Sequence, residues 1–347
     1  MGSKTSKPQP RAPTAGGSST IVRHAVVCKQ GNHSSKKTNE DAWCFAPVGS
    51  SAVAAVFDGH RGDGASQFCA DSLPTVLTEV MAESSATHVI AQHLEETFVR
   101  LDVRFIRSNP GSIAGCSALA VAVACDGGRR QLIVAGAGDC RAVLCQEGGQ
   151  ASALFMEHTP DMPAEAERVL RAGGELRGNG RVYQATSVTM NPENWGLQMT
   201  RSIGDADFKF CGDELWQRPR PTLPAEYMAD PRRANTVLSG VPTVQTRELE
   251  VTDEFVVLGS DGLWDGYMLD DDGVTELDLG AEGGQAVISF VGQRLARARG
   301  AERLGEAGEG TEADHEELRA IADELISRVR AHATGAYDDC TVAILLL

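Results

Sequence analysis

Acidic residues at the ends of apolar runs are the residues of this sequence best suited to chemistry. Five predicted strands carry one or two carboxylates at one end, usually beside glycine: Asp58 after 53–57, Asp139 before 141–144, Asp261 after 255–260, Asp338 and Asp339 before 341–347, and Glu40 and Asp41 before 42–45. A single Asp-Gly after a strand usually forms a turn. Several carboxylates that converge, however, repel one another unless cations neutralise them or protons are retained.

A converging set of this kind predicts a site for hard metal ions. Carboxylate oxygens without paired His or Cys ligands favour Mg²⁺ or Mn²⁺ over zinc. Two such ions side by side would polarise a phosphoryl group and supply a hydroxide at neutral pH. The glycines beside the carboxylates would let backbone carbonyls approach the ions. The pattern therefore indicates metal-assisted phosphoryl chemistry.

One histidine stands beside this set. His60 follows Asp58 and Gly59 directly. An imidazole titrates near neutral pH, so it could protonate the leaving oxygen of a phosphate ester. The alternatives are a metal ligand or a histidine held by loop hydrogen bonds. The remaining histidines lack this context, and we expect them to be ordinary surface residues: His24, His33, His88, His93, His158, His315 and His332.

The elements that must position these residues form a mixed pattern. Strands are predicted at 42–46, 52–57, 256–258 and 341–347, and apolar residues at helical spacing cover 64–81, 87–106, 285–298 and about 315–332. Between 117 and 154, three apolar runs are joined by short Gly- and Asp-rich connections. Short connections join antiparallel neighbours, whereas a parallel crossover needs about a dozen residues or more. The sequence therefore predicts a meander in an antiparallel sheet, within an α+β layered domain.

Composition narrows the class of protein. The 347 residues are 42% hydrophobic, which is enough for a large core. The formal net charge is −16, from 32 basic and 48 acidic residues. This balance argues against binding of a nucleic-acid backbone. The nine cysteines stand singly, without a C-x-x-C pair, which favours reduced thiols in a cytosolic compartment.

The first 20 residues differ from the rest. They are rich in Pro, Ser and Gly, and Gly2 with Ser6 fits the acceptor pattern for N-myristoylation. One acyl chain binds membranes only marginally, so basic residues in the tail would have to add to peripheral membrane contact. The alternative is a disordered or vector-derived tail. No apolar run approaches the ~18–20 residues of a membrane span.

The motifs together resemble those of the metal-dependent serine/threonine protein phosphatases, the PPM or type 2C family. They occur in order as NEDAW, VFDGHRGDGAS, GCS, AGAGDCRAVL, LQMTRSIGD, EFVVLGSDGLWD and DDCTVAILL. The resemblance covers 21–347 and implies a four-layer αββα sandwich of two antiparallel sheets flanked by helix pairs. It also implies a monomer with two Mn²⁺ or Mg²⁺ ions and a weaker third. These ions would activate water for direct hydrolysis of phosphoserine or phosphothreonine in phosphoprotein substrates.

The same resemblance assigns the metal ligands. Asp58 would bridge both metals, and Gly59 would contribute its carbonyl oxygen. Asp261 and Asp338 would bind one of the two metals. Asp139, with Asp261, would hold the third ion.

Other roles follow from the resemblance, with some departures. Glu40 and Asp41 would hold metal-bound waters, and His60 would be the general acid. Lys36 and Lys37 stand where the family has a phosphate-binding arginine. Lysine neutralises phosphate without the bidentate fork, which predicts weaker anchoring.

Three segments depart further from the family pattern. Asp338-Asp339 replaces the usual Asp-Asn pair, which would tighten metal binding or raise a carboxylate pKa. The flap signature is altered at 197–202 within a long excursion over 157–235. The stretch 300–312 reads as an acidic insertion, and 270–272 as a solvated acidic loop. A pseudophosphatase that binds partners through the same fold is the alternative to an active enzyme.

Overall fold

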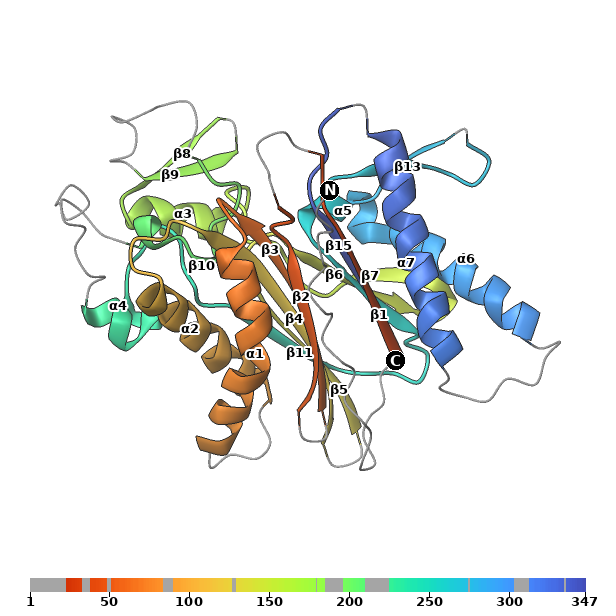
Figure 1. The fold of residues 1–347 in the computed structure, drawn as a ribbon, viewed down its shortest axis with the longest axis horizontal. Helices are drawn as coiled ribbons and strands as arrows, with labels where there is room; N and C mark the ends of the chain where they lie inside the picture. The colour runs from red at the N-terminus through yellow and green to blue at the C-terminus, as the bar shows by residue number, and fades with distance from the viewer. Residues whose placement is uncertain are drawn as a thin grey trace, which may run out of the picture.

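The computed structural model describes residues 23–32, 38–48, 51–83, 90–126, 129–178, 180–184, 196–209, 225–273, 275–302, 312–333 and 335–347. Two antiparallel β-sheets pack face to face within this part of the chain, and a pair of helices covers the outer face of each (Figure 1). This layer order confirms the predicted four-layer αββα sandwich.

The first sheet is built around the strand that precedes Asp58. Its order is β11-β5-β4-β3-β2, and all neighbours are antiparallel. The strands are β2 (Ala42–Val48), β3 (Ser51–His60), β4 (Gly115–Asp126), β5 (Arg129–Ala137) and β11 (Thr243–Glu248). A short strand, β10 (Ile203–Gly204), pairs with the start of β4.

The second sheet contains the strands that lead to Asp261 and follow Asp338. Its order is β1-β15-β12-β6-β7, again antiparallel throughout. The strands are β1 (Arg23–Lys29), β6 (Arg141–Gln146), β7 (Gln150–Ala153), β12 (Phe255–Gly259) and β15 (Cys340–Leu346). The central strands β12 and β15 are buried on both faces, which explains their continuous apolar sequences.

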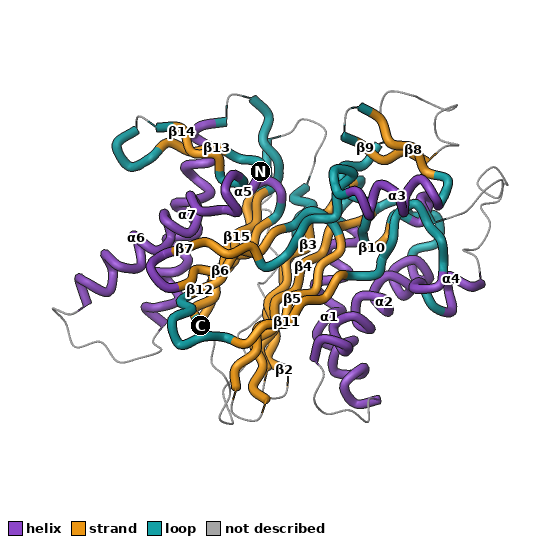
Figure 2. The backbone as a smooth tube through the Cα atoms, turned by 180° about the vertical axis from the view of Figure 1, so that it is seen from behind, coloured by secondary structure: helices purple, strands orange, loops and turns teal. Residues whose placement is uncertain are grey.

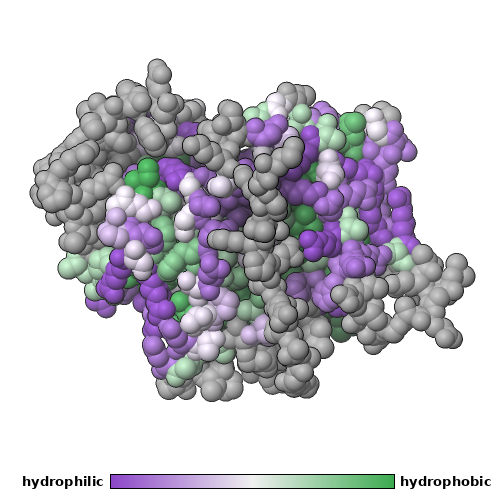
Figure 3. Space-filling model, in the orientation of Figure 1, coloured by the Kyte–Doolittle hydropathy of each residue, from purple (hydrophilic) through white to green (hydrophobic). Residues whose placement is uncertain are grey.

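Strand alternation divides the apolar residues among three layers. On β3, Val53 and Phe57 face the helices, whereas Val56 faces the layer between the sheets. The helices α1 (Gly64–Glu83) and α2 (Ile90–Ser108) cover the first sheet, and α6 (Gln285–Glu302) and α7 (Glu312–His332) cover the second (Figure 2). Hydrophilic residues lie over the outer side of α7 on the face seen in Figure 3.

One prediction about this topology is wrong. β4 and β5 pair as expected, but β6 lies in the second sheet instead of continuing the meander. Gly138 between them has a φ of 123°, and a Cβ there would collide with Ser117. The chain therefore turns sharply out of the first sheet at a position that only glycine tolerates. A short Gly-rich connection signals the turn but does not say which sheet receives the next strand.

The described part of the excursion over 157–235 has an apolar cluster of its own. It contains α3 (Pro163–Arg171), β8 (Gly174–Arg177), β9 (Arg181–Gln184) and α4 (Ala225–Ala229). Val169, Val182 and Leu238 are buried in a separate apolar cluster there. Glu165 is buried as well and binds Arg168 and Arg201.

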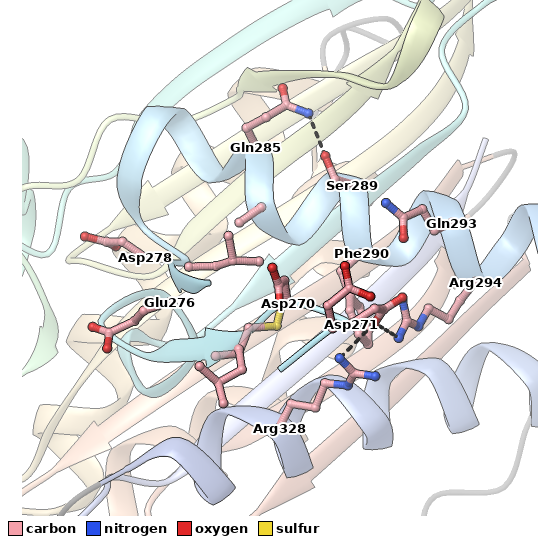
Figure 4. A pocket seen from close by; sticks show the side chains of 15 residues that line it. Asp270, Asp271, Glu276, Asp278, Gln285, Ser289, Phe290, Gln293, Arg294 and Arg328 are labelled. Atoms are coloured by element: carbon pink, nitrogen blue, oxygen red, sulfur yellow. Dashed lines mark hydrogen bonds and ion pairs between the residues drawn. The ribbon is translucent and has the colours of Figure 1, made fainter. Parts of the chain in front are cut away.

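An unpredicted hairpin follows α5 (Asp261–Trp264). Its strands are β13 (Tyr267–Leu269) and β14 (Glu276–Asp278). The acidic loop between them is more than a solvated run, because Asp271 pairs with Arg294 and Arg328 from α6 and α7 (Figure 4). This network packs the loop against a pocket of about 570 Å³ beside the two helices.

Some sequence predictions fall outside the described residues. They are the tail with Gly2, the phosphate-binding candidates Lys36 and Lys37, and most of the acidic insertion at 300–312. No helix among the described residues combines the length and the apolar character needed to cross a membrane.

Candidate metal centre

The end of β3 carries Asp58 and His60 to the edge of the first sheet. They pair with Ser117 and Gly115 of β4. Because Val56 faces the layer between the sheets, the two-residue period directs Asp58 and His60 to the same face, toward the second sheet. Gly59 has a different role, since a Cβ there would collide with the carbonyl oxygen of Glu40.

Asp261 meets Asp58 from the other sheet. It follows β12 and opens α5. Its backbone N–H donates a hydrogen bond to Asp58 Oδ2 across 3.3 Å. Two strand ends that lie 203 residues apart in the chain therefore come into contact, as the sequence predicts.

The carboxylates raise one another's pKa values. Burial raises the pKa of Asp58 well above its ordinary value, and the negative charges of Asp261 and Asp41 add to this. Burial likewise raises the pKa of Asp261, with Asp139 and Asp338 as the neighbouring charges. Electrostatic repulsion thus links Asp41, Asp58, Asp139, Asp261 and Asp338 into one acidic set, which makes the site a strong attractor for cations.

Asp41 and Glu40 are held firmly beside β3. Asp41 is 3% exposed, and its Oδ2 accepts hydrogen bonds from the hydroxyls of Ser260 and Thr341, each at 2.8 Å. Glu40 Oε1 accepts from the backbone N–H of Gly62 at 2.6 Å. Both carboxylates are therefore oriented by the ends of neighbouring strands.

Asp338 and Asp339 differ in exposure and in their contacts. Asp338 is exposed at the mouth of the site, whereas Asp339 is buried. The two oxygens of Asp339 accept hydrogen bonds from the backbone N–H groups of Gly31 and Glu40, at 2.6 and 2.7 Å. A carboxylate supplies two acceptors here where asparagine would supply one, so the departure from the family pattern serves to position Glu40.

Asp139 and Asp265 extend the acidic set. Asp139 Oδ1 accepts from the Ser117 hydroxyl at 2.6 Å, and burial raises its pKa. Burial also raises the pKa of Asp265 to about 6, and Asp139 and Glu157 add to the shift. Sequence reasoning missed Asp265, although it stands one helical turn after Asp261 in the Ser-Asp-Gly-Leu-Trp-Asp motif.

His158 forms hydrogen bonds with the turn that precedes Asp139. The expectation that it lies on the surface is wrong, because it is only 2% exposed. Its Nδ1 accepts from the backbone N–H of Gly138 at 3.3 Å, and its Nε2 lies 2.8 Å from the Thr243 hydroxyl. His93 is also buried, at 5% exposure. The burial of His158 could not be predicted from the sequence, because its partners Gly138 and Thr243 come from other segments of the chain.

A pH dependence of stability follows from His158. Burial, with the nearby charge of Arg201, lowers its pKa from 6.5 to about 3. Between these values the unfolded chain binds a proton that the folded chain does not, so the free energy of unfolding falls as the pH falls from about 6.5 to about 3. The loss is on the order of 4 kcal/mol at the acidic end.

The variant His158→Asn tests this pH dependence. Asn can accept from Gly138 but does not titrate. Denaturant unfolding at several pH values between 6.5 and 5 should show a smaller loss of stability in the variant than in the wild type. Above pH 5, Glu165 adds nothing to the difference, since its pKa falls from 4.5 to about 2. Parallel curves for the two proteins would contradict the role given to His158.

The histidine of the site is bound to a carboxylate that sequence reasoning gave no role. His60 Nε2 lies 2.8 and 3.0 Å from the two carboxylate oxygens of Asp205, which is fully buried. Burial alone would raise the pKa of Asp205, but His60 and Arg61 hold it well below its usual range. The only sequence signal for Asp205 was its place in the LQMTRSIGD motif.

The donor set fits hard dications. It consists of carboxylate oxygens and the Gly59 carbonyl, and Asp261 Oδ1 is buried without a hydrogen-bond partner among the described residues. In that part of the chain, no three His, Cys, Asp or Glu side chains already enclose one point as metal ligands do. Mg²⁺ keeps several of its waters when it binds to proteins, so one or two carboxylates per ion suffice.

A groove opens from this site. It has a volume of about 650 Å³, and its lining includes Asp261 and Asp338 together with Tyr267, Glu276 and Tyr337. A phosphorylated side chain could reach the carboxylates from this side, because the groove gives room for the chain that carries it.

Comparison with known proteins agrees with this geometry. The family model of Protein phosphatase 2C matches residues 20–277. A probable protein phosphatase 2C 14 from Arabidopsis thaliana is 32% identical over 69% of this chain and 45% of its own length. A protein kinase and PP2C-like domain-containing protein from rice (Oryza sativa subsp. japonica) is 31% identical over 60% of this chain and 27% of its own length. The chain thus spans less than half the length of these two curated relatives.

Solved structures share the fold. A serine-threonine phosphatase 2C from Toxoplasma gondii superposes with a TM-score of 0.64 at 20% identity, over 96% of this chain and 98% of the other. A sex determining protein from C. elegans superposes with a TM-score of 0.59 at 22% identity, over 94% of this chain and 64% of the other. The matched family model covers most of the chain and confirms the resemblance read from the motifs. The chain belongs to the protein phosphatase 2C family.

Proposed function

We propose that this chain is a metal-dependent protein phosphatase that hydrolyses phosphoserine and phosphothreonine in phosphoproteins. The observation that carries the proposal is the contact between Asp58 and Asp261, which joins the acidic ends of two different sheets. Membership of the phosphatase 2C family supports it. A pseudophosphatase would have no use for this set of carboxylates, so that alternative is disfavoured.

Two Mn²⁺ or Mg²⁺ ions would be held where the carboxylates converge. Asp58 would bridge them, the Gly59 carbonyl would bind beside it, and Asp261 and Asp338 would bind one of the pair. Asp139 with Asp261 would hold a weaker third ion. When bound, such ions lower the pKa of water and polarise the phosphoryl group.

The chain's own residues would complete the reaction. Glu40 and Asp41 would orient waters, and Lys36 and Lys37 would neutralise the phosphate. The attacking water loses one proton to solvent and its oxygen bonds to phosphorus, while the bond from phosphorus to the serine or threonine oxygen breaks. His60 gives a proton to that leaving oxygen. The reaction needs no phosphoenzyme intermediate.

The direct test is hydrolysis of a phosphothreonine peptide by the purified chain. We expect phosphate release that requires Mn²⁺ or Mg²⁺, stops with EDTA and returns when the metal is restored. The control is Asp58→Ala under the same conditions. If the wild type releases no more phosphate than this variant, the pseudophosphatase assignment replaces the enzyme.

The sequence also predicts a cytoplasmic monomer with peripheral membrane contact through an acylated Gly2. Intact-mass measurement of the protein from native cells would detect the myristoyl group directly, and an unmodified mass would contradict the prediction.

A further inference from the structure

We propose that Asp205 positions His60, and that Nδ1 is the ring nitrogen from which His60 donates its proton. This inference rests on the proposed phosphatase function and adds a residue to it. His60 is the catalytic residue, whereas Asp205 acts through His60 and is a positioning residue.

The first argument is the occupation of Nε2. Both carboxylate oxygens of Asp205 lie within 3.0 Å of His60 Nε2. An ionised carboxylate only accepts hydrogen bonds, so Nε2 must carry a proton to make this contact. Nε2 is thereby committed to Asp205, and Nδ1 is the nitrogen left to face the reaction. After it gives up the Nδ1 proton, the ring keeps its Nε2–H, so the contact survives the step without a ring flip.

The second argument is the rigidity of Asp205. It is fully buried and also accepts hydrogen bonds from Arg61 and from the Ser202 hydroxyl. A Cβ on Gly115 would collide with its carboxylate, so β4 is shaped to admit it. Three segments of the chain, at 60–61, 115 and 202, therefore fix one carboxylate in place, as a group that orients a catalytic ring requires.

The third argument is backbone strain on both sides of this contact. Arg61 has a φ of 59° and Asp205 a φ of 48°, and these are the only non-glycine residues with positive φ that the structure records in the described residues. Residues other than glycine adopt this region at a cost, which persists only where the surroundings determine it. Here the ion pair between Arg61 and Asp205 joins the two strained positions directly beside His60.

Asp207 provides a matched control. It pairs with the same guanidinium of Arg61, at 2.8 Å, and lies two residues from Asp205 in the same turn. None of the hydrogen bonds or ion pairs found among the described residues joins it to His60. Asp207→Asn and Asp205→Asn therefore remove the same charge from Arg61, but only the second disturbs the histidine.

The test compares two small substrates that differ in their need for a proton. p-Nitrophenyl phosphate has a leaving group that departs unaided, whereas phenyl phosphate needs general-acid help. Asp205→Asn should lower kcat for phenyl phosphate about 10²-fold, the size of a general-acid contribution, and lower it far less for p-nitrophenyl phosphate. Asp207→Asn should leave the ratio of the two kcat values as in the wild type.

The other possible results bear either on the role of Asp205 or on the proposed phosphatase function. An equal loss on both substrates, or no loss on either, would overturn the role of Asp205. A wild type that hydrolyses neither substrate would instead overturn the proposed function. If Asp205→Asn does not fold, ¹⁵N spectra of wild-type protein labelled at histidine decide the matter. We expect a proton on Nε2 of His60, and an unprotonated Nε2 would refute the inference.

Discussion

Replacing Asp58 by asparagine is expected to lower metal-dependent kcat/KM by about 10³-fold or more, since it removes the carboxylate proposed to bridge the ions. The same change should raise the thermal midpoint of the metal-free protein. Asp58 is crowded by Asp261 and Asp41, and its raised pKa shows that its charge destabilises the folded chain when no cation is present. Phosphatase assays with Mn²⁺ and calorimetry in EDTA measure the two effects.

Because Asp58→Asn is expected to lower the activity but raise the thermal midpoint, the two measurements distinguish loss of the metal site from misfolding. A variant that simply misfolds would lose activity and stability together. The exposed Asp272 serves as the control, and Asp272→Asn should change neither quantity. If Asp58→Asn keeps its activity, or melts at a lower temperature than the wild type in EDTA, then Asp58 does not have the role proposed here.

The second large effect concerns a buried ion pair between the excursion and α2. Lys209 Nζ lies 2.5 Å from Asp102 Oδ1, and both side chains are fully buried. Asp102 also accepts hydrogen bonds from the Gly204 backbone and the Tyr227 hydroxyl. Lys209→Met leaves the carboxylate without its cation, and it should reduce the free energy of unfolding by about 3–5 kcal/mol, measured by denaturant titration.

A double-mutant cycle checks the cause. Asp102→Asn, added to Lys209→Met, removes the uncompensated charge and should recover part of the loss. Strictly additive effects would show that the ion pair is not the source of the stability. Because α2 carries Asp102 and the excursion carries Lys209, the cycle also measures how much this ion pair contributes to holding the excursion against α2.

Much of this architecture could be predicted because apolar runs and their ends are local signals. The runs before Asp58 and Asp261 predict buried strands, and the position of a carboxylate at each end predicts where the two meet. The destination of β6 could not be predicted, since Gly138 marks a turn without naming the receiving sheet. Short strands such as β13 and β14 have too few residues to show a period.

The polar contacts that orient the site were the least predictable. Asp205 lies 145 residues from His60 in the chain. Whether a given aspartate is buried against a histidine depends on packing between segments, and no local pattern in the sequence records it. The same is true of His158, because its local sequence is that of a loop and its contact with the backbone N–H of Gly138 forms only in the folded chain.

The central claim is that aspartates from two sheets together hold a pair of hard dications. Electron paramagnetic resonance of the purified chain titrated with Mn²⁺ tests it most directly. We expect two tightly bound ions per chain with a spin-coupled spectrum, and loss of the coupling in Asp58→Asn. A single isolated ion, or a coupled spectrum that Asp58→Asn leaves unchanged, would contradict the claim.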